Sequence, residues 1–278
     1  MKIGLVSDLH IDVTSLNKAL MPHLLEAVKA AELDVLVIAG DLARHLVQLS
    51  ETLNAFQLAD LACKKLFVPG NHDIWAIETP DVTSEQKCDI ISKLCYACGF
   101  HPLMDKPFIT EKVAFCGTIG WYDYTFAPDG YDFSEAQYAE KELMGAVWND
   151  KRYAKWSDTD RKVTQRFEVA LAAQIASVRD AVSRIIVVTH HVPFRECVEY
   201  RGELPWDFFR AFMGSKHFGA CCWREPLVTH ALFGHVHQSI DMQLRSVRAI
   251  CAPVGYLYEA PKIGLKAYAS RCLACFEV

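Results

Sequence analysis

The sequence lacks several features that would assign it to a specialised class of protein. Its 278 residues contain no apolar run that approaches the roughly 18 residues of a membrane span. Asp8 and His10 interrupt the first apolar run, which argues against a signal peptide. The formal net charge of -5 argues against a broad nucleic-acid-binding surface. We therefore expect a cytoplasmic protein that does not associate with membranes.

Cysteine is plentiful, with eleven residues, but nothing points to an oxidising compartment, so we expect reduced thiols. Two pairs have the C-x-x-C spacing of half a zinc ribbon, namely Cys95 with Cys98 and Cys272 with Cys275. The second pair falls in an apolar run typical of a C-terminal strand, where its side chains would point to opposite faces. We therefore favour buried thiols over a structural zinc site.

Five apolar runs in the sequence each end in a cluster of polar residues. Continuous apolar runs are typical of strands that are covered on both faces of a sheet. The runs and the clusters that follow them are residues 2–6 and 7–10, 34–39 and 40–41, 65–68 and 70–73, 184–189 and 190–191, and 231–233 and 234–237. The polar residues are therefore expected where buried strands end.

Helical patterns separate the first three runs. Ser15 and Ser50 are candidate N-caps for two helices, the first with Leu20, Leu24 and Val28 at helical spacing. Alternating strands and helices favour right-handed crossovers and parallel strands, whose polar ends meet at one sheet edge. A longer helix is expected over about 159–182, before the strand at 184–189.

Two segments are rich in aromatic residues. Residues 121–156 contain ten of the chain's 31 aromatic residues, and residues 194–223 contain another eight. Such insertions could pack as a satellite core beneath long loops or line a cap over a binding site, and the two arrangements are compatible. Because the sequence contains no linker, we expect a single domain over residues 1–278.

Each polar cluster is a weak signal by itself. The segment Pro69-Gly70-Asn71 would suit a simple turn, and an isolated histidine is usually a structural residue rather than a ligand. Five clusters in order favour a metal or catalytic site instead. The motifs are Asp8-x-His10, Gly40-Asp41, Gly70-Asn71-His72-Asp73, His190 and Gly234-His235-x-His237. With these motifs the chain resembles the calcineurin-like metallophosphoesterase superfamily, and within it the small bacterial-type phosphoesterases.

The resemblance implies an α/β fold, a four-layer α/β/β/α sandwich of two mixed sheets flanked by helices. It also implies two metal ions, divalent or of mixed valence. One ion would be bound by Asp8, His10 and His237, the other by Asn71, His190 and His235, and Asp41 would bridge the two. His191 lies beside the matching histidine in sequence and is a candidate substrate-binding neighbour.

These ligand types suit the implied reaction. Two divalent ions bring a charge of about +4 and the two aspartates about -2, so the site stays positive and attracts a phosphoryl group. Nitrogen and oxygen ligands suit Mn, Fe, Zn, Co or Ni. By the resemblance, a metal-bound hydroxide attacks phosphorus in line, and His72 is the catalytic residue, either as a general acid or as a hydrogen-bond donor to the phosphate. We expect hydrolysis of a small phosphomonoester or phosphodiester.

Departures from the motifs of the protein serine/threonine phosphatases of this superfamily narrow the range of expected substrates and argue against a phosphoprotein. Those enzymes carry Gly-Asp-x-Val-Asp-Arg-Gly at the second cluster, and Arg44 stands here in place of the aspartate that orients their catalytic histidine. Arg44 and His45 could contact a substrate phosphate or be solvated surface residues. Trp75, Trp121 and Tyr122 could form an apolar wall that suits a nucleotide, or could pack in the core.

Two other classes of function compete with a phosphohydrolase. A non-catalytic scaffold on the same fold would lack site residues, notably the catalytic histidine, yet His72 and all seven ligand positions are present. A nuclease of the recombination-repair branch would be favoured by a basic groove or an added DNA-binding domain, and the sequence shows neither. A dimetal phosphoesterase is therefore the expected function.

Overall fold

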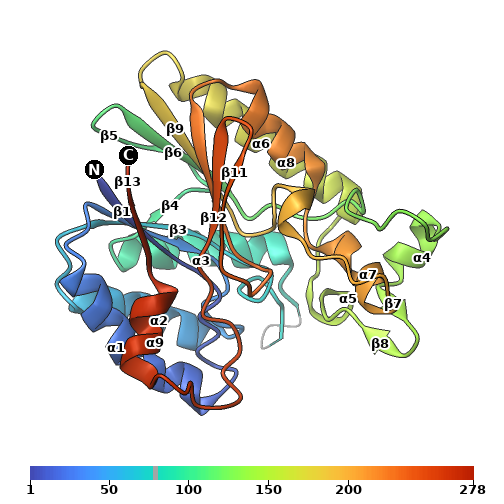
Figure 1. Cartoon of the computed structure of the whole chain (residues 1–278), viewed down its shortest axis with the longest axis horizontal. Helices are drawn as coiled ribbons and strands as arrows, with labels where there is room; N and C mark the ends of the chain where they lie inside the picture. The colour runs from blue at the N-terminus through green and yellow to red at the C-terminus, as the bar shows by residue number, and fades with distance from the viewer. Residues whose placement is uncertain (78–80) are drawn as a thin grey trace.

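Two sheets stacked face to face form the centre of the molecule, and helices cover their outer faces (Figure 1). The computed structural model describes residues 1–77 and 81–278. The first sheet has the strand order β13 (Ala274–Glu277), β1 (Lys2–Val6), β2 (Val35–Ala39), β3 (Lys64–Val68) and β4 (His101–Pro102). The second has the order β11 (Ile240–Leu244), β12 (Val247–Cys251), β10 (Val228–Phe233), β9 (Arg184–Thr189), β6 (Val113–Thr118) and β5 (Phe108–Thr110). Both sheets are mixed, because β13, β11 and β5 run antiparallel to otherwise parallel strands.

Helices complete the outer layers. On the side of the first sheet, α1 (Ser15–Ala30) packs against α9 (Leu265–Cys272), and α2 (Leu46–Leu58) packs against α3 (Ser84–Ala97). On the other side, α6 (Asp160–Val178) contacts β6, and α8 (Lys216–Arg224) contacts β10. The predicted α/β/β/α sandwich is therefore confirmed. No helix within residues 1–77 and 81–278 combines the length and the apolar character that a membrane span requires.

Successive side chains along each strand alternate between two cores, which explains the continuous apolar sequences of the strands. In β2, Val35 and Val37 belong to a core made only of strand and strand-edge residues from both sheets, which therefore fills the layer between them. Leu36 and Ile38 belong to the larger core, which includes helix residues. Because successive side chains point to opposite faces, a strand covered on both sides needs apolar residues at every position.

The two aromatic insertions pack against each other as a lobe beside the sandwich, at the right of Figure 1. The lobe contains α4 (Glu135–Ala139), β7 (Glu142–Leu143), β8 (Ala146–Val147), α5 (Asp150–Tyr153) and α7 (Trp206–Phe209). Across it, the ring of Tyr138 stacks on Phe208 with centroids 4.8 Å apart, and Arg195 donates a hydrogen bond to the Ala127 carbonyl. The buried aromatic residues of the insertions belong to the larger core, not to a separate satellite core. A single domain over residues 1–278 stays a prediction.

Three local predictions differ from the structure. Thr14, not Ser15, caps α1, because the Thr14 hydroxyl accepts a hydrogen bond from the Asn17 N–H at 3.0 Å. Ser50 lies inside α2, which begins at Leu46 without a side-chain cap. Cys272 ends helix α9 instead of lying in the C-terminal strand, so only Cys275 of that pair is in β13. The long helix expected at about 159–182 is confirmed as α6.

Candidate metal centre

The polar clusters lie in loops at the carboxyl ends of β1, β2, β3, β9 and β10. An isolated bridge between Ser7 and Pro253 joins the two sheets at this edge. Backbone hydrogen bonds also join the loops, from the Asp8 N–H to the Gly40 carbonyl at 2.9 Å and from the Gly234 N–H to the His190 carbonyl at 3.0 Å. Polar side chains from distant parts of the sequence therefore meet in one place.

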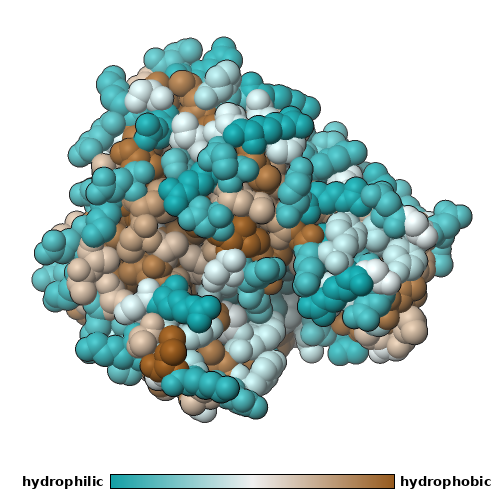
Figure 2. All heavy atoms as spheres, viewed as in Figure 1, coloured by the Kyte–Doolittle hydropathy of each residue, from teal (hydrophilic) through white to brown (hydrophobic). Residues whose placement is uncertain are grey.

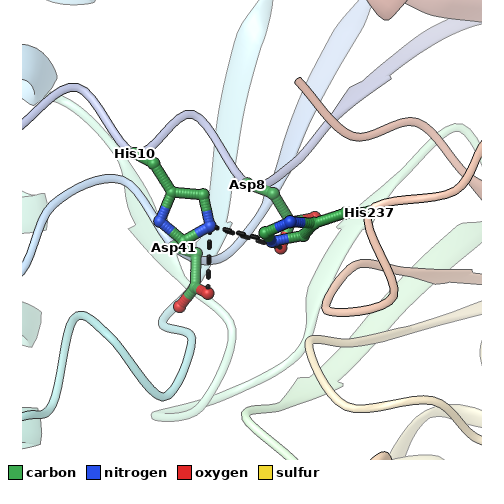
Figure 3. A group of neighbouring side chains, drawn as sticks. All are labelled: Asp8, His10, Asp41 and His237. Atoms are coloured by element: carbon green, nitrogen blue, oxygen red, sulfur yellow. Dashed lines mark hydrogen bonds and ion pairs between the residues drawn. The ribbon is translucent and has the colours of Figure 1, made fainter. Parts of the chain in front are cut away.

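The first group of candidate metal ligands comprises Asp8, His10, Asp41 and His237, whose side chains turn toward one another (Figure 3). One ligand atom from each lies within 4.8 Å of the others. His10 Nε2 lies 3.0 Å from His237 Nε2 and 3.6 Å from Asp41 Oδ2. His237 Nε2 also lies 3.4 Å from Asp8 Oδ1. Two imidazole nitrogens and two carboxylate oxygens that face a common point suit a divalent transition-metal ion.

The second group comprises Asp41, His190 and His235. His190 Nε2 lies 3.4 Å from Asp41 Oδ2 and 3.2 Å from His235 Nδ1. Asn71 joins this group, because its amide oxygen lies 3.1 Å from the same His190 nitrogen. Asp41 Oδ2 is the oxygen that also faces His10 in the first group. One carboxylate oxygen therefore lies between the two groups.

Five of the candidate ligands have a left-handed backbone conformation, which residues other than glycine seldom adopt. Their φ angles are 56° at Asp8, 47° at His10, 58° at Asp41, 74° at His235 and 49° at His237. Such conformations persist only where surrounding structure fixes them, and they concentrate at functional sites. Several of the strained backbone positions therefore coincide with the residues that the motifs identified.

Asp73, the last residue of the Gly-Asn-His-Asp motif, has a structural role that requires a carboxylate. Its buried carboxylate accepts hydrogen bonds from the N–H groups of Asp41, Leu42 and Ala43 at 2.8–3.0 Å and from Gly70 N–H at 2.7 Å. The side chain therefore joins the loop after β3 to the loop after β2. It fixes the backbone of Asp41, the residue shared by the two groups.

The buried carboxylates and imidazoles of the site shift one another's pKa values. Burial raises the pKa of Asp8, but the hydrogen bond and charge of His237 outweigh it and lower the pKa to about 2. Burial lowers the pKa of His190, but the Asp41 carboxylate outweighs it and raises the pKa to about 9. Burial and the neighbouring His190 lower the pKa of His235 to about 3. Asp8 is thus ionised and His235 is neutral, as metal ligands must be, whereas His190 holds a proton that a bound cation would displace.

His72 lies beside both groups, and among the described contacts its side chain donates no hydrogen bond to a candidate ligand. Only its backbone N–H does so, to Asp41 Oδ1 at 2.9 Å. The imidazole stacks on Trp75 with centroids 3.7 Å apart, and its Nε2 lies 3.3 Å from the Tyr256 hydroxyl. Stacking and this contact orient the ring in place of a carboxylate partner. Burial is the main cause that lowers the pKa of His72 to about 4.

A cavity of about 600 Å³ opens over the two groups. Its floor includes Asp41, Asn71, His72, His235 and His237, and its sides come from the lobe, from the loop after β12 and from Trp75 in the loop after β3. The side residues with the largest side chains are Trp75, Trp148, Arg201, Trp206, Met213 and Tyr256. Figure 2 shows the lobe set off from the sandwich by a recess. The candidate metal centre is therefore open to a small molecule.

The predicted substrate residues after β2 do not reach this cavity. The Arg44 guanidinium donates to the Asp12 carboxylate at 3.4 Å and to the Asp12 carbonyl at 2.8 Å. His45 occupies the N-cap position of α2. Neither residue is part of the cavity lining. We therefore leave both out of the proposed substrate site.

The predicted aromatic wall is divided between the cavity and the core. Trp75 lines the cavity. Trp121 and Tyr122 are 0% exposed and pack in the core, so they are outside the cavity lining. His191 is also fully buried, with its ring 4.4 Å from that of His235 and edge-on to Trp121. We interpret these three residues as support for the ligand loops.

The sequence analysis missed several residues of the site. Tyr256 follows the apolar run of β12, so the rule of a polar side chain after a buried strand could have identified it. Trp148 and Arg201 lie in the aromatic insertions, where no periodicity marks individual residues. Asp150 is a buried carboxylate of the lobe that contacts Asn71. No local sequence signal distinguishes it from the other aspartates of the insertion.

Comparisons with known proteins agree with this geometry. A family model described as calcineurin-like phosphoesterase matches residues 1–239. A search of curated proteins found no match.

Two solved structures have the same fold. One is described as a phosphopantetheinyl hydrolase from Mycobacterium tuberculosis, with a TM-score of 0.75 and 22% identity over 92% of this chain and 89% of that one. The other is described as a dimetal phosphatase from Danio rerio, with a TM-score of 0.54 and 14% identity over 94% of this chain and 89% of that one. At these identities the likeness shows the fold alone.

Proposed function

The chain belongs to the calcineurin-like phosphoesterase family, and we propose that it hydrolyses a small phosphoester at two metal sites that share Asp41. The observation that carries the proposal is the position of Asp41 Oδ2, which is 3.6 Å from His10 Nε2 and 3.4 Å from His190 Nε2. A carboxylate between two groups of imidazole ligands is the arrangement that a two-metal phosphoesterase needs.

The donor set fits two such ions. Each group contains two imidazole nitrogens that face each other, 3.0 Å apart for His10 and His237 and 3.2 Å apart for His190 and His235. A cation between such nitrogens would receive both lone pairs. When bound, the two ions would supply positive charge to a phosphoryl group and activate water for in-line attack.

In this proposal the protein residues hold the metal ions and orient the substrate. Asp8, His10 and His237 would hold one ion, Asn71, His190 and His235 would hold the other, and Asp41 would be shared between them. His72 donates a hydrogen bond or a proton from its Nε2, the atom that faces Tyr256 at the cavity. Trp75 keeps that imidazole at a fixed angle, because the two rings stack with an interplanar angle of 27°.

The lobe side of the cavity selects the organic part of the substrate. Trp148, Trp206 and Met213 offer apolar surface, and the Arg201 guanidinium stacks 3.6 Å from the Trp206 ring centroid. We propose a phosphoester with a sizeable organic group, such as a nucleotide or a phosphopantetheine ester, in the cytoplasm. The description of the first relative as a phosphopantetheinyl hydrolase supports including the latter, because a pantetheine arm has both apolar and amide groups.

The test is a substrate panel run on protein that has been stripped of metal and reloaded with one metal at a time. The panel contains p-nitrophenyl phosphate, bis-p-nitrophenyl phosphate, nucleotides and phosphopantetheine esters. We expect metal-dependent turnover, preferred by at least tenfold for the substrates with the larger organic group. A fully loaded protein that hydrolyses none of them would favour the non-catalytic scaffold instead.

A further inference from the structure

Asp150 is the one lobe residue that forms a side-chain hydrogen bond to a candidate metal ligand among the described contacts. It is the first residue of α5 and is 2% exposed. Its Oδ1 accepts from Asn71 Nδ2 at 2.9 Å and from Trp75 Nε1 at 2.6 Å. Its Oδ2 accepts from Tyr122 OH at 3.0 Å and from Trp148 Nε1 at 2.7 Å. Four donors thus occupy the four acceptor positions that a carboxylate offers.

The first consequence concerns the orientation of the Asn71 amide. An asparagine amide can turn by half a rotation, which exchanges its oxygen and nitrogen. The bond from Nδ2 to Asp150 allows only one of these orientations, because a carboxylate accepts and does not donate. In that orientation Oδ1 faces His190 Nε2 at 3.1 Å, on the side of the second group. Asp150 therefore selects the oxygen as the atom that Asn71 presents to a metal ion.

The second consequence concerns the surroundings of the substrate. Trp75 stacks on His72, and Trp148 lines the cavity and lies edge-on to His235 with centroids 5.7 Å apart. Both indoles donate to Asp150. The same carboxylate thus fixes a metal ligand, the support of the catalytic histidine and a side of the cavity.

We propose that Asp150 is a positioning residue for the metal centre, which acts through Asn71 and links the lobe to the second metal site. The proposal rests on the proposed function, because it takes Asn71 as a metal ligand. Residues that hydrogen-bond to metal ligands commonly change metal affinity by about 10–100-fold when they are replaced. We expect a loss in this range for one of the two ions.

The matched variants are Asp150→Ala and Asp160→Ala. Asp150→Ala removes the acceptor of the Asn71 amide, whereas an asparagine could keep its oxygen toward Asn71 and donate its NH₂ group to the Tyr122 hydroxyl. Asp160 is the control, because its carboxylate accepts from the Trp121 indole at 2.8 Å, the Tyr124 hydroxyl at 2.5 Å and the Lys141 ammonium at 2.6 Å, none of which is a candidate ligand. Stepwise Mn²⁺ binding is measured by calorimetry on metal-free full-length protein, with thermal midpoints recorded for each variant.

The expected result is two Mn²⁺ per wild-type chain and a roughly 10–100-fold weaker second step in Asp150→Ala, with both steps unchanged in Asp160→Ala. In an Asn71→Ala background, Asp150→Ala should weaken Mn²⁺ binding by less than about threefold, because the residue it acts through is gone. An equal loss in that background, or in Asp160→Ala, would show a general loss of stability and overturn the role. Unchanged binding in Asp150→Ala would overturn it while the proposed function stands. A wild-type chain that binds fewer than two Mn²⁺ would overturn both.

Discussion

Replacing His72 by alanine should separate proton donation from metal binding. Among the described contacts the imidazole donates no hydrogen bond to a candidate ligand, and the one bond from this residue to Asp41 comes from the backbone N–H, which alanine keeps. The neighbouring Asn71 amide is held by Asp150. The variant should therefore retain both metal ions while losing the imidazole that we propose as the donor to the leaving oxygen of the substrate.

The magnitude of the loss depends on the leaving group. p-Nitrophenolate is stable as an anion near neutral pH, so its departure needs little help, and we expect a loss of kcat of about tenfold or less. An alkoxide leaving group needs a proton, and the expected loss is about 10²–10⁴-fold, the range that a positioned general acid contributes. Loss of the stacking contact between His72 and Trp75, at 3.7 Å, should cost about 0.5–1.5 kcal/mol of stability.

The assay compares kcat on p-nitrophenyl and alkyl esters for the wild type, His72→Ala and His237→Ala, with metal analysis of each. His237→Ala serves as the contrast, because it should lose metal and both activities together. Equal losses on both esters with the metals retained would refute proton donation and assign His72 to binding the phosphoryl group. Burial lowers the pKa of His72 to about 4, which favours a neutral imidazole near neutral pH in the protein without metal, so proton donation requires the charge of the bound phosphoryl group to raise this pKa. Metal loss in His72→Ala would refute its status as a non-ligand.

Three further predictions follow from the same contacts. Asp41→Ala should lose both metal ions whereas Asn71→Ala loses mainly one, because Asp41 Oδ2 faces both groups; elemental analysis showing equal, mild losses would contradict the bridging role. All eleven cysteines are free in the structure and should titrate as thiols in denaturant without reductant, and a shortfall by an even number would indicate disulfides. Burial and the charges of Arg248 and Arg184 lower the pKa of His230 from 6.5 to about 4, so the unfolded chain binds more protons between these pH values and stability falls as the pH drops through this window. Denaturant unfolding should therefore show that the free energy of unfolding decreases from pH 7 to pH 5. The decrease should be roughly 1 kcal/mol smaller in His230→Asn than in the wild type, and equal decreases would contradict this effect.

The fold could be predicted because its evidence is local in the sequence. Runs such as residues 34–39 are apolar at nearly every position, which only a strand covered on both faces requires. Element boundaries were less certain, because the end of a helix depends on a few competing contacts. Ser50 has the chemistry of an N-cap, yet α2 begins one turn earlier, and buried Leu49, Leu53 and Phe56 anchor it against the core.

The place of the candidate ligands could also be predicted, because their clusters follow strands within a few residues, while their division between two metal ions rested on the resemblance to a known family. A strand end fixes where a side chain starts, and parallel strands bring such ends to one edge. The substrate residues could not be predicted in this way. Trp121 and Trp148 lie in the same insertion, but the first is fully buried and the second lines the cavity. Long-range packing decides between these outcomes, and no periodicity records it.

The restraint on the ligands comes from residues outside the ligand set. Asp8 and Asp41 have φ angles of 56° and 58°, so their backbones would relax to commoner conformations if nothing held them. The Asp73 carboxylate holds the loop after β2 by accepting hydrogen bonds from backbone N–H groups of that loop, including the N–H of Asp41. Asp8 is held by backbone hydrogen bonds to Gly40 and Gly255. Because these contacts involve no ligand atom, the protein fixes the geometry of the site before any cation binds. The motif residues therefore divide into those that present ligand atoms and those, such as Asp73, that keep them in place.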